Sequence, residues 1–275
     1  MAESSVLNVK NLTVRYGEGC PLCEHSMEKN RCTVCKSIWA LNDISLELYP
    51  GEVLGIVGES GSGKTTLMRS LYFDFVPTVG TATLRDYSDG EENIWDASPA
   101  KQRMIKNNLM GMVYQNPVMG LRMNHSAASN IAEKLISAGN RNAGEMTARA
   151  SELLESVEIL TSRMKEAPKH FSGGMQQRVQ IAKALSMYPA LLLLDEVTTG
   201  LDLSVQARVL DLIRNIKSRF GISILLVSHD LAVIRMLADR TIVMLDGKIV
   251  ESGLSDQILE DPQHPYTQQL VYSLI

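Results

Sequence analysis

The chain has no apolar run near the roughly 20 residues that a membrane-spanning helix needs. Its first residues also lack the basic-then-apolar layout of a signal peptide. The formal charge at pH 7 is only −4, which has the wrong sign for a protein that binds nucleic acid through its overall field. These features predict a cytoplasmic protein that reaches any membrane through a partner, and we expect no nucleic-acid partner.

Cysteine is absent outside one short segment, in which two C-x₂-C pairs are separated by eight residues. In a cytosolic chain this clustering indicates a metal site rather than disulfides. The expected ligands are Cys20, Cys23, Cys32 and Cys35, holding a tetrahedral, mainly structural Zn²⁺. The hydrophilic residues between the pairs argue against four buried thiols without metal. An iron–sulfur cluster is the alternative, and His25 could replace one ligand.

The apolar pattern predicts one α/β domain over residues 1–275. Alternating residues predict strands over 6–14 and 41–48, as a hairpin that the cysteine-rich insertion 17–37 interrupts. The continuous apolar run 53–58 predicts a strand buried on both faces.

The second half of the chain changes character twice. Residues 116–188 are mostly helical by apolar spacing. After position 189 short apolar runs alternate with helical patterns, with helices expected over 205–219 and 230–238. This alternation predicts βαβ units on a parallel sheet.

One segment matches the phosphate-binding pattern G-x-x-x-x-G-K-[ST] at every fixed position, between a predicted buried strand and a predicted helix. Glycines allow backbone N–H groups to point at phosphate oxygens, and the helix N-terminus adds partial positive charge. The lysine should reach the β- and γ-phosphates, and the threonine hydroxyl should bind Mg²⁺. A chance glycine-rich turn is a poor alternative for so complete a match. The predicted ATP-binding residues here are Gly58, Glu59, Ser60, Gly61, Ser62, Gly63, Lys64, Thr65 and Thr66.

Two later strands end in candidate catalytic residues. The apolar run 191–194 is followed by Asp195 and Glu196, and buried strands rarely end in paired carboxylates unless a cation lies nearby. We expect Asp195 to bind Mg²⁺ and Glu196 to orient or deprotonate the attacking water. The run 224–227 leads into His229, and ligands bind at the carboxyl ends of parallel strands. His229 is therefore expected beside the γ-phosphate.

The motif Phe171-Ser172-Gly173-Gly174 is by itself only a common helix N-cap. Together with the motifs above it resembles the signature of ABC ATPases, and the resemblance covers almost the whole chain. It implies a P-loop NTPase of the ABC type: a RecA-like parallel sheet core, an antiparallel β subdomain and an α-helical subdomain over 116–188. It also implies that the protein hydrolyses ATP.

The resemblance assigns further residues to the ATP site. Gln115 would sense the γ-phosphate and bind Mg²⁺, and Tyr16 would stack on adenine unless it is only a packing residue at a strand end. The turn Ser172–Gly174 would cap the ATP held by a second copy of the chain, and Asp202 would lie in the loop that crosses the interface. The implied assembly is an ATP-dependent homodimer.

The segment after Gln115 points to a partner. Residues 116–125 are similar to the ABC subunit of the carbon–phosphorus lyase system, which works with a soluble phosphonate-degrading complex. This resemblance implies soluble lyase subunits as partners, docked around Leu121 and Arg122. The alternative is the ATPase subunit of a peptide or nickel importer, bound to a membrane permease. A nucleic-acid remodeller gains no support from the charge.

Overall fold

The computed structural model describes residues 4–272, and the chain divides into two compact units. The first unit contains the chain up to Ser98 and again from Leu225, and the second contains Pro99–Ile224. Strand β9 (Ser223–Val227) begins in the second unit and ends in the first. Among the described residues, no helix has both the length and the apolar character needed to cross a bilayer.

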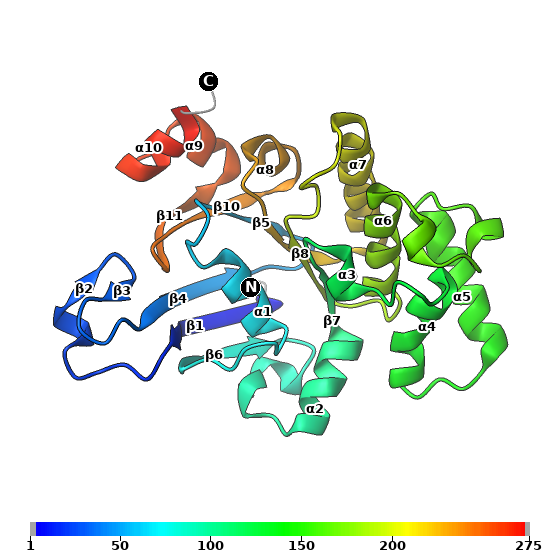
Figure 1. Cartoon of the computed structure of the whole chain (residues 1–275), viewed down its shortest axis with the longest axis horizontal. Coiled ribbons are helices and arrows are strands. Elements are labelled where there is room, and N and C mark those ends of the chain that lie inside the picture. The colour runs from blue at the N-terminus through cyan, green and yellow to red at the C-terminus, as the bar shows by residue number, and fades with distance from the viewer. Residues whose placement is uncertain (1–3, 273–275) are drawn as a thin grey trace. The chain divides into compact units, whose positions relative to one another are not determined.

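An antiparallel sheet in the first unit has the strand order β2-β3-β4-β1-β6 (Figure 1). Its long strands β1 and β4 pair from Leu7 with Leu48 to Tyr16 with Ile38, so the predicted hairpin is confirmed. The pairing is interrupted by bulges, and the insertion lies between the paired ends Tyr16 and Ile38. The strands are β1 (Leu7–Tyr16), β2 (Met27–Glu28), β3 (Arg31–Cys32), β4 (Ile38–Leu48) and β6 (Val79–Leu84).

The first unit also contains the strands β11-β10-β5-β9, in that order. All five residues of β5 are buried, as the continuous apolar run predicted. The β10–β11 hairpin turns at Asp246 and Gly247, which both have positive φ (47° and 77°), a conformation that Asp-Gly adopts readily. These elements are β5 (Val53–Val57), β10 (Arg240–Leu245), β11 (Lys248–Leu254), α1 (Lys64–Leu71), α8 (Leu231–Leu237), α9 (Ser255–Glu260) and α10 (Pro265–Tyr272).

The second unit pairs β7 with β8 in parallel, and most of its other elements are helices. All residues of both strands are buried. Its elements are β7 (Met110–Val113), β8 (Leu191–Asp195), α2 (Pro99–Met104), α3 (Pro117–Gly120), α4 (Ala127–Ser137), α5 (Ala143–Ser156), α6 (Gly173–Ala184) and α7 (Leu203–Phe220).

Side-chain caps fix where the functional helices begin. Ser172 accepts a hydrogen bond from the Met175 amide at the start of α6, and Asp202 accepts one from the Val205 amide at the start of α7. Helix α7 ends at Gly221, whose φ of 62° suits glycine. Short helical turns complete the chain at Cys23–His25, Ser88–Gly90, Ile94–Asp96, Ile105–Leu109, Thr161–Arg163 and Pro168–His170.

Candidate functional site

The loop between β5 and α1 follows a path that only glycine allows. Gly58, Gly61 and Gly63 have φ of 147°, 86° and 106°. A Cβ on Gly58 would overlap the carbonyl oxygen of Met244, and a Cβ on Gly63 would overlap that of Ala40. The loop is therefore pressed against β10 on one side and against β4 on the other.

Lys64 lies folded over this loop. Its Nζ donates to the carbonyl oxygens of Gly58 (2.8 Å) and Glu59 (2.7 Å), and its side chain is only 5% exposed. Helix α1 begins behind Gly63, which has no side chain to cap the first turn. The arrangement gathers an ammonium group and helix N–H donors at one place, as anion binding requires.

The other loop residues divide by exposure. Ser62 is buried, and its carbonyl oxygen accepts a hydrogen bond from the Gly247 amide (3.1 Å). Thr66 is half-buried, and the exposed members are Glu59, Ser60, Gly61 and Thr65.

Tyr16 and His229 belong to the same unit as the loop. The Tyr16 hydroxyl lies 3.3 Å from the Thr66 hydroxyl, and its ring meets the edge of Phe75 at 5.9 Å. The ring is 41% exposed, so one part of it packs and another faces solvent. His229 is exposed just after β9, where the Ser228 amide donates to the Ile56 carbonyl of β5 (3.2 Å). It thus follows the strand next to the one that leads into the loop.

In the second unit the structure brings Gln115 and Glu196 together. Gln115 Nε2 donates to Glu196 Oε2 at 2.8 Å, and the Thr199 hydroxyl donates to the same oxygen at 3.3 Å. Asp195 is 3% exposed at the end of β8. Glu196 has a φ of 48°, a left-handed conformation that costs a non-glycine residue energy and that concentrates at active sites.

The signature turn is exposed at its first two residues and buried at its third. Ser172 and Gly173 are exposed at the start of α6, whereas Gly174 is buried. A Cβ on Gly174 would overlap the side chain of Val205, so glycine is needed for α6 to approach α7. Asp202 caps α7, and hydrogen bonds, the largest from the Ser204 hydroxyl, hold the pKa of its carboxyl below the usual value.

Two buried glutamines on α6 were not predicted. Gln180 Oε1 accepts from the Tyr114 amide (2.9 Å), and both Gln177 and Gln180 donate to the Tyr114 carbonyl (3.3 and 3.0 Å). Helix α6, which begins with the signature, is therefore hydrogen-bonded to the backbone of Tyr114, next to Gln115. Two amides spaced three residues apart on an otherwise apolar face were the available signal.

A second unpredicted contact reaches the phosphate loop from α10. The Tyr266 hydroxyl accepts a hydrogen bond from the Glu59 amide at 2.7 Å. Helix α10 is itself held by the Glu251 carboxylate, which accepts from the amides of Gln263 (2.8 Å) and His264 (3.0 Å). The partners are 207 residues apart in sequence, so no local pattern could have revealed the contact.

The four cysteines converge as predicted, and none forms a disulfide. Their sulfurs all lie within 4.8 Å of one another, with Cys20–Cys23 at 3.8 Å, Cys20–Cys32 at 3.9 Å and Cys23–Cys35 at 3.5 Å. Hydrogen bonds, the largest from the Ser37 hydroxyl, lower the pKa of the Cys23 thiol to about 6 and also lower that of Cys35. Burial raises the pKa of Cys20 to about 11.

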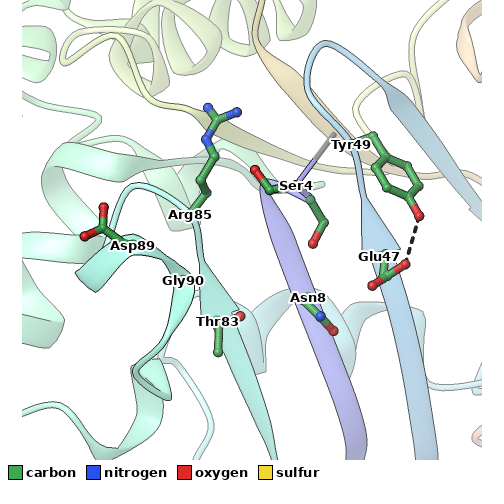
Figure 2. Close-up of a pocket in the computed structure, with 9 residues that line it drawn as sticks. Ser4, Asn8, Glu47, Tyr49, Thr83, Arg85, Asp89 and Gly90 are labelled. Carbon is green, nitrogen blue, oxygen red and sulfur yellow. Dashed lines mark hydrogen bonds between the residues drawn. The ribbon is translucent and has the colours of Figure 1, made fainter. Parts of the chain in front are cut away.

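A separate hollow of about 400 Å³ lies over the antiparallel sheet and contains none of the predicted site residues (Figure 2). Asn8 of β1 lies opposite Glu47 of β4 and Thr83 of β6, and the Tyr49 hydroxyl donates to Glu47 at 2.8 Å. The hollow is thus a polar, solvent-facing row of the sheet, to which we assign no ligand.

Comparison with known proteins gives matches along most of the chain. Residues 41–199 match the family model described as ABC transporter. The chain is 48% identical over 234 residues to the putative phosphonates utilization ATP-binding protein PhnK of Escherichia coli (strain K12), covering 85% of this chain and 91% of PhnK. It is 35% identical to the oligopeptide transport ATP-binding protein OppF of Bacillus subtilis (strain 168), covering 86% of this chain and 77% of OppF.

Solved structures agree with these sequence matches. A dimeric post-hydrolysis state of the ATP-binding cassette MJ0796, bound to ADP and Pi, superposes with a TM-score of 0.76 and 27% identity, covering 90% of this chain and 98% of that one. The CbiO1 protein of Clostridium perfringens, part of the CbiONQ transporter complex, superposes with a TM-score of 0.75 at 24% identity, covering 94% of this chain and 92% of that one.

The contact between Tyr266 and the phosphate loop can be tested by removing one oxygen. Tyr266→Phe keeps the ring but leaves the Glu59 amide without this acceptor. The phosphate loop is then less constrained before ATP binds, so binding costs more conformational entropy. We expect ATP affinity to fall by roughly two- to tenfold, measured by isothermal titration. Tyr272→Phe, on the same helix and 60% exposed, is the matched control. Equal affinities for the two variants would contradict this role.

Proposed function

The chain belongs to the ABC transporter family and has the nucleotide-binding fold of that family, and from this premise we propose that two copies close head to tail around two ATP molecules. As an ABC ATPase it binds ATP with Mg²⁺ and hydrolyses it. The resemblance read from the sequence is therefore correct for both the family and the activity.

The observation that carries the dimer proposal is the exposure of the signature turn. Ser172 and Gly173 face solvent at the start of a 12-residue helix, where N–H groups and a hydroxyl can reach an anion that this chain does not itself supply. Gly174 and Val205 fix the turn from behind. The MJ0796 cassette, which shares the fold, is dimeric with ADP and Pi bound, and this supports the same arrangement here.

In such a dimer each ATP would contact both copies. The phosphate loop and Lys64 of one copy hold the β- and γ-phosphates, and the Ser172–Gly173 turn of the other supplies donors on the far side of the γ-phosphate. Phosphoryl transfer depends mainly on positioning and charge neutralisation, so neither half is sufficient alone. ATP then joins the two copies, and its hydrolysis weakens the joint and reopens the dimer.

Glu196 is the residue that we propose acts on the attacking water. Its Oε2 accepts hydrogen bonds from Gln115 and Thr199, which orients the carboxylate before the substrate arrives. Gln115 thereby gains a second role, as a positioning residue for Glu196 as well as a sensor of the γ-phosphate. His229, after β9, would donate a hydrogen bond to the γ-phosphate.

The donor types at the predicted Mg²⁺ positions fit a hard cation. Thr65 offers a hydroxyl, Asp195 a carboxylate and Gln115 an amide oxygen, and Mg²⁺ prefers oxygen ligands of these kinds. Gln115 donates to Glu196 through Nε2, so its Oε1 is the atom left for the metal. Bound with ATP, the ion would neutralise charge on the β- and γ-phosphates.

A hydrolysis-deficient variant tests the dimer directly. Glu196→Gln keeps the shape of the side chain but removes its charge, so ATP should stay intact and hold the two copies together. We expect light scattering to show twice the monomer mass with saturating ATP and Mg²⁺, and the monomer mass with ADP. Adding Ser172→Arg to the same variant should abolish the dimer. A monomer at saturating ATP, with or without cellular partners, would contradict the proposal.

We also propose that the driven partner is a soluble assembly of the carbon–phosphorus lyase type. The identity of 48% to PhnK over most of both chains supports this assignment. The expected docking segment needs one correction, because Leu121 is only 5% exposed and cannot be a contact residue. The exposed apolar side chains of this segment are Val118 (59%) and Met119 (54%) on α3, and Arg122 pairs with Glu133 beside them (2.8 Å).

A membrane permease is the alternative partner, favoured by the similarity to OppF. The ATP-trapped Glu196→Gln dimer distinguishes the two when it is used as bait in cell extract. We expect it to capture soluble lyase-type subunits, and the capture should weaken when Met119→Asp is added. Capture of a permease instead would overturn the partner assignment and leave the ATPase reading intact.

We propose that the four cysteines hold one structural Zn²⁺. A zinc ion with bonds of about 2.3 Å to four sulfurs separates neighbouring sulfurs by about 3.8 Å. The three separations given above, 3.5–3.9 Å, agree with this value, and all four sulfurs lie within 4.8 Å of one another. The converging group in the described residues consists of the four cysteines, and His25 is not part of it. The exposed loops of the insertion bury little apolar surface, so a bound metal would be the main interaction that holds them together.

Metal analysis tests this site. The purified protein should contain about one zinc per chain, since one Cys₄ set binds one ion. Cys23→Ser combined with Cys32→Ser should lose the zinc, whereas His25→Ala should retain it. Iron with visible absorption in place of zinc would support the cluster alternative, and retention of zinc by the double variant would contradict the ligand set.

A further inference from the structure

The cysteine insertion is bound to the strand end that the phosphate loop rests on. The Trp39 amide of β4 donates to the Asn30 carbonyl of the insertion (2.7 Å), and Arg31 of β3 pairs with Ile38. The next residue, Ala40, presents the carbonyl oxygen that a Cβ on Gly63 would overlap. One residue step therefore separates the insertion from the phosphate loop.

A second connection runs through Gly247. A Cβ on Gly247 would lie 2.6 Å from the Trp39 carbonyl oxygen, so this turn also packs directly on the start of β4. The Gly247 amide donates to the Ser62 carbonyl (3.1 Å), and the Asn42 amide donates to the Gly247 carbonyl (2.8 Å). The position of Trp39 is thus transmitted to the phosphate loop along two short routes.

The insertion also holds the end of β1. Arg15 donates to the carbonyl oxygens of Gly17 (3.3 Å) and Glu18 (2.7 Å), and its guanidinium lies 5.7 Å from the ring centre of Trp39. Tyr16 follows directly, and its hydroxyl contacts that of Thr66 in α1. These contacts therefore connect the insertion to the end of β1 and, through Tyr16, to the first turn of α1.

The metal ligands are tied to the same strand ends. The Ser37 hydroxyl lies 3.5 Å from the sulfur of Cys23 and 3.0 Å from that of Cys35, and the Cys32 amide donates to the Ser37 carbonyl (2.9 Å). Ser37 directly precedes β4 and is 4% exposed. An insertion of this size has too little core to order itself, so its order depends on the metal.

We infer that the cysteine insertion, once its metal is bound, positions the nucleotide site: it holds Tyr16 and Ala40 against the phosphate loop, so that loss of the metal weakens ATP binding. The inference rests on the proposed zinc site and on the stacking of Tyr16 on adenine that the family resemblance implies. It gives the insertion a function in the ATPase itself, separate from any partner. The cysteines remain remote from the reacting phosphate, so the rate at saturating ATP should change little.

The first test compares ATP affinity with zinc content in the full-length protein. Zinc removed by a chelator, or by Cys23→Ser with Cys32→Ser, should raise the dissociation constant for ATP about tenfold, which corresponds to roughly 1.4 kcal/mol. Adding zinc back should restore the chelated wild type. Glu28→Gln, an exposed change within the insertion, is the matched control and should alter neither zinc nor affinity. Unchanged affinity in protein shown to lack zinc would overturn the inference.

A second test does not touch the cysteines. Arg15→Gln keeps all four ligands but removes the donors to Gly17 and Glu18, and it should weaken ATP binding while zinc stays bound. In a Tyr16→Ala background, zinc removal should cost less affinity than in wild type, because one of the contacts between the insertion and the nucleotide site is already gone. Additive effects would contradict transmission through Tyr16. Lys64→Ala in the otherwise wild-type protein tests the nucleotide site itself. If this variant binds ATP as tightly as wild type, the proposed nucleotide site is wrong, and this result differs from a failure of the zinc inference alone.

Discussion

Backbone amides can surround a phosphate only where the chain turns tightly enough to aim several of them at one point, and here that turn depends on two glycines in van der Waals contact with neighbouring strands. Gly58 lies against the Met244 carbonyl and Gly63 against the Ala40 carbonyl. Any side chain at either position would push the loop away from its support. We therefore expect the affinity for ATP to depend on how firmly β10 and β4 hold the loop from its two sides.

Much of the first unit can be understood as support for that loop. Tyr266 fixes the Glu59 amide from α10, and the Gly247 turn fixes Ser62. The cysteine insertion fixes the end of β4 that Gly63 rests on. In the second unit the same logic applies to Glu196, whose carboxylate is oriented by Gln115 and whose backbone is strained. We therefore expect ATP binding and ATP hydrolysis to rely on separate sets of supporting contacts.

The features of this structure that depend on neighbouring residues could be predicted from the sequence. The apolar runs gave β5 and β8, helix spacing gave α7 and α8, and the glycine motif gave the phosphate loop. Contacts between residues far apart in the sequence produce no local pattern. The hydrogen bond between Tyr266 and Glu59, and those of Gln177 and Gln180 to Tyr114, are therefore visible only in the structure. Leu121 was expected at a partner surface, but apolar character alone does not distinguish a buried side chain from an exposed one.

The central claim, that one copy's signature turn completes the other copy's ATP site, is tested most directly by mixing two inactive variants. Lys64→Ala disables the phosphate loop and Gly173→Asp disables the signature. A mixed dimer then has one site with both lesions and one with neither. We expect each variant alone to be inactive and an equal mixture to regain up to about a quarter of wild-type ATP hydrolysis, as random pairing of a two-fold dimer requires. No recovery on mixing, with both variants folded, would contradict it.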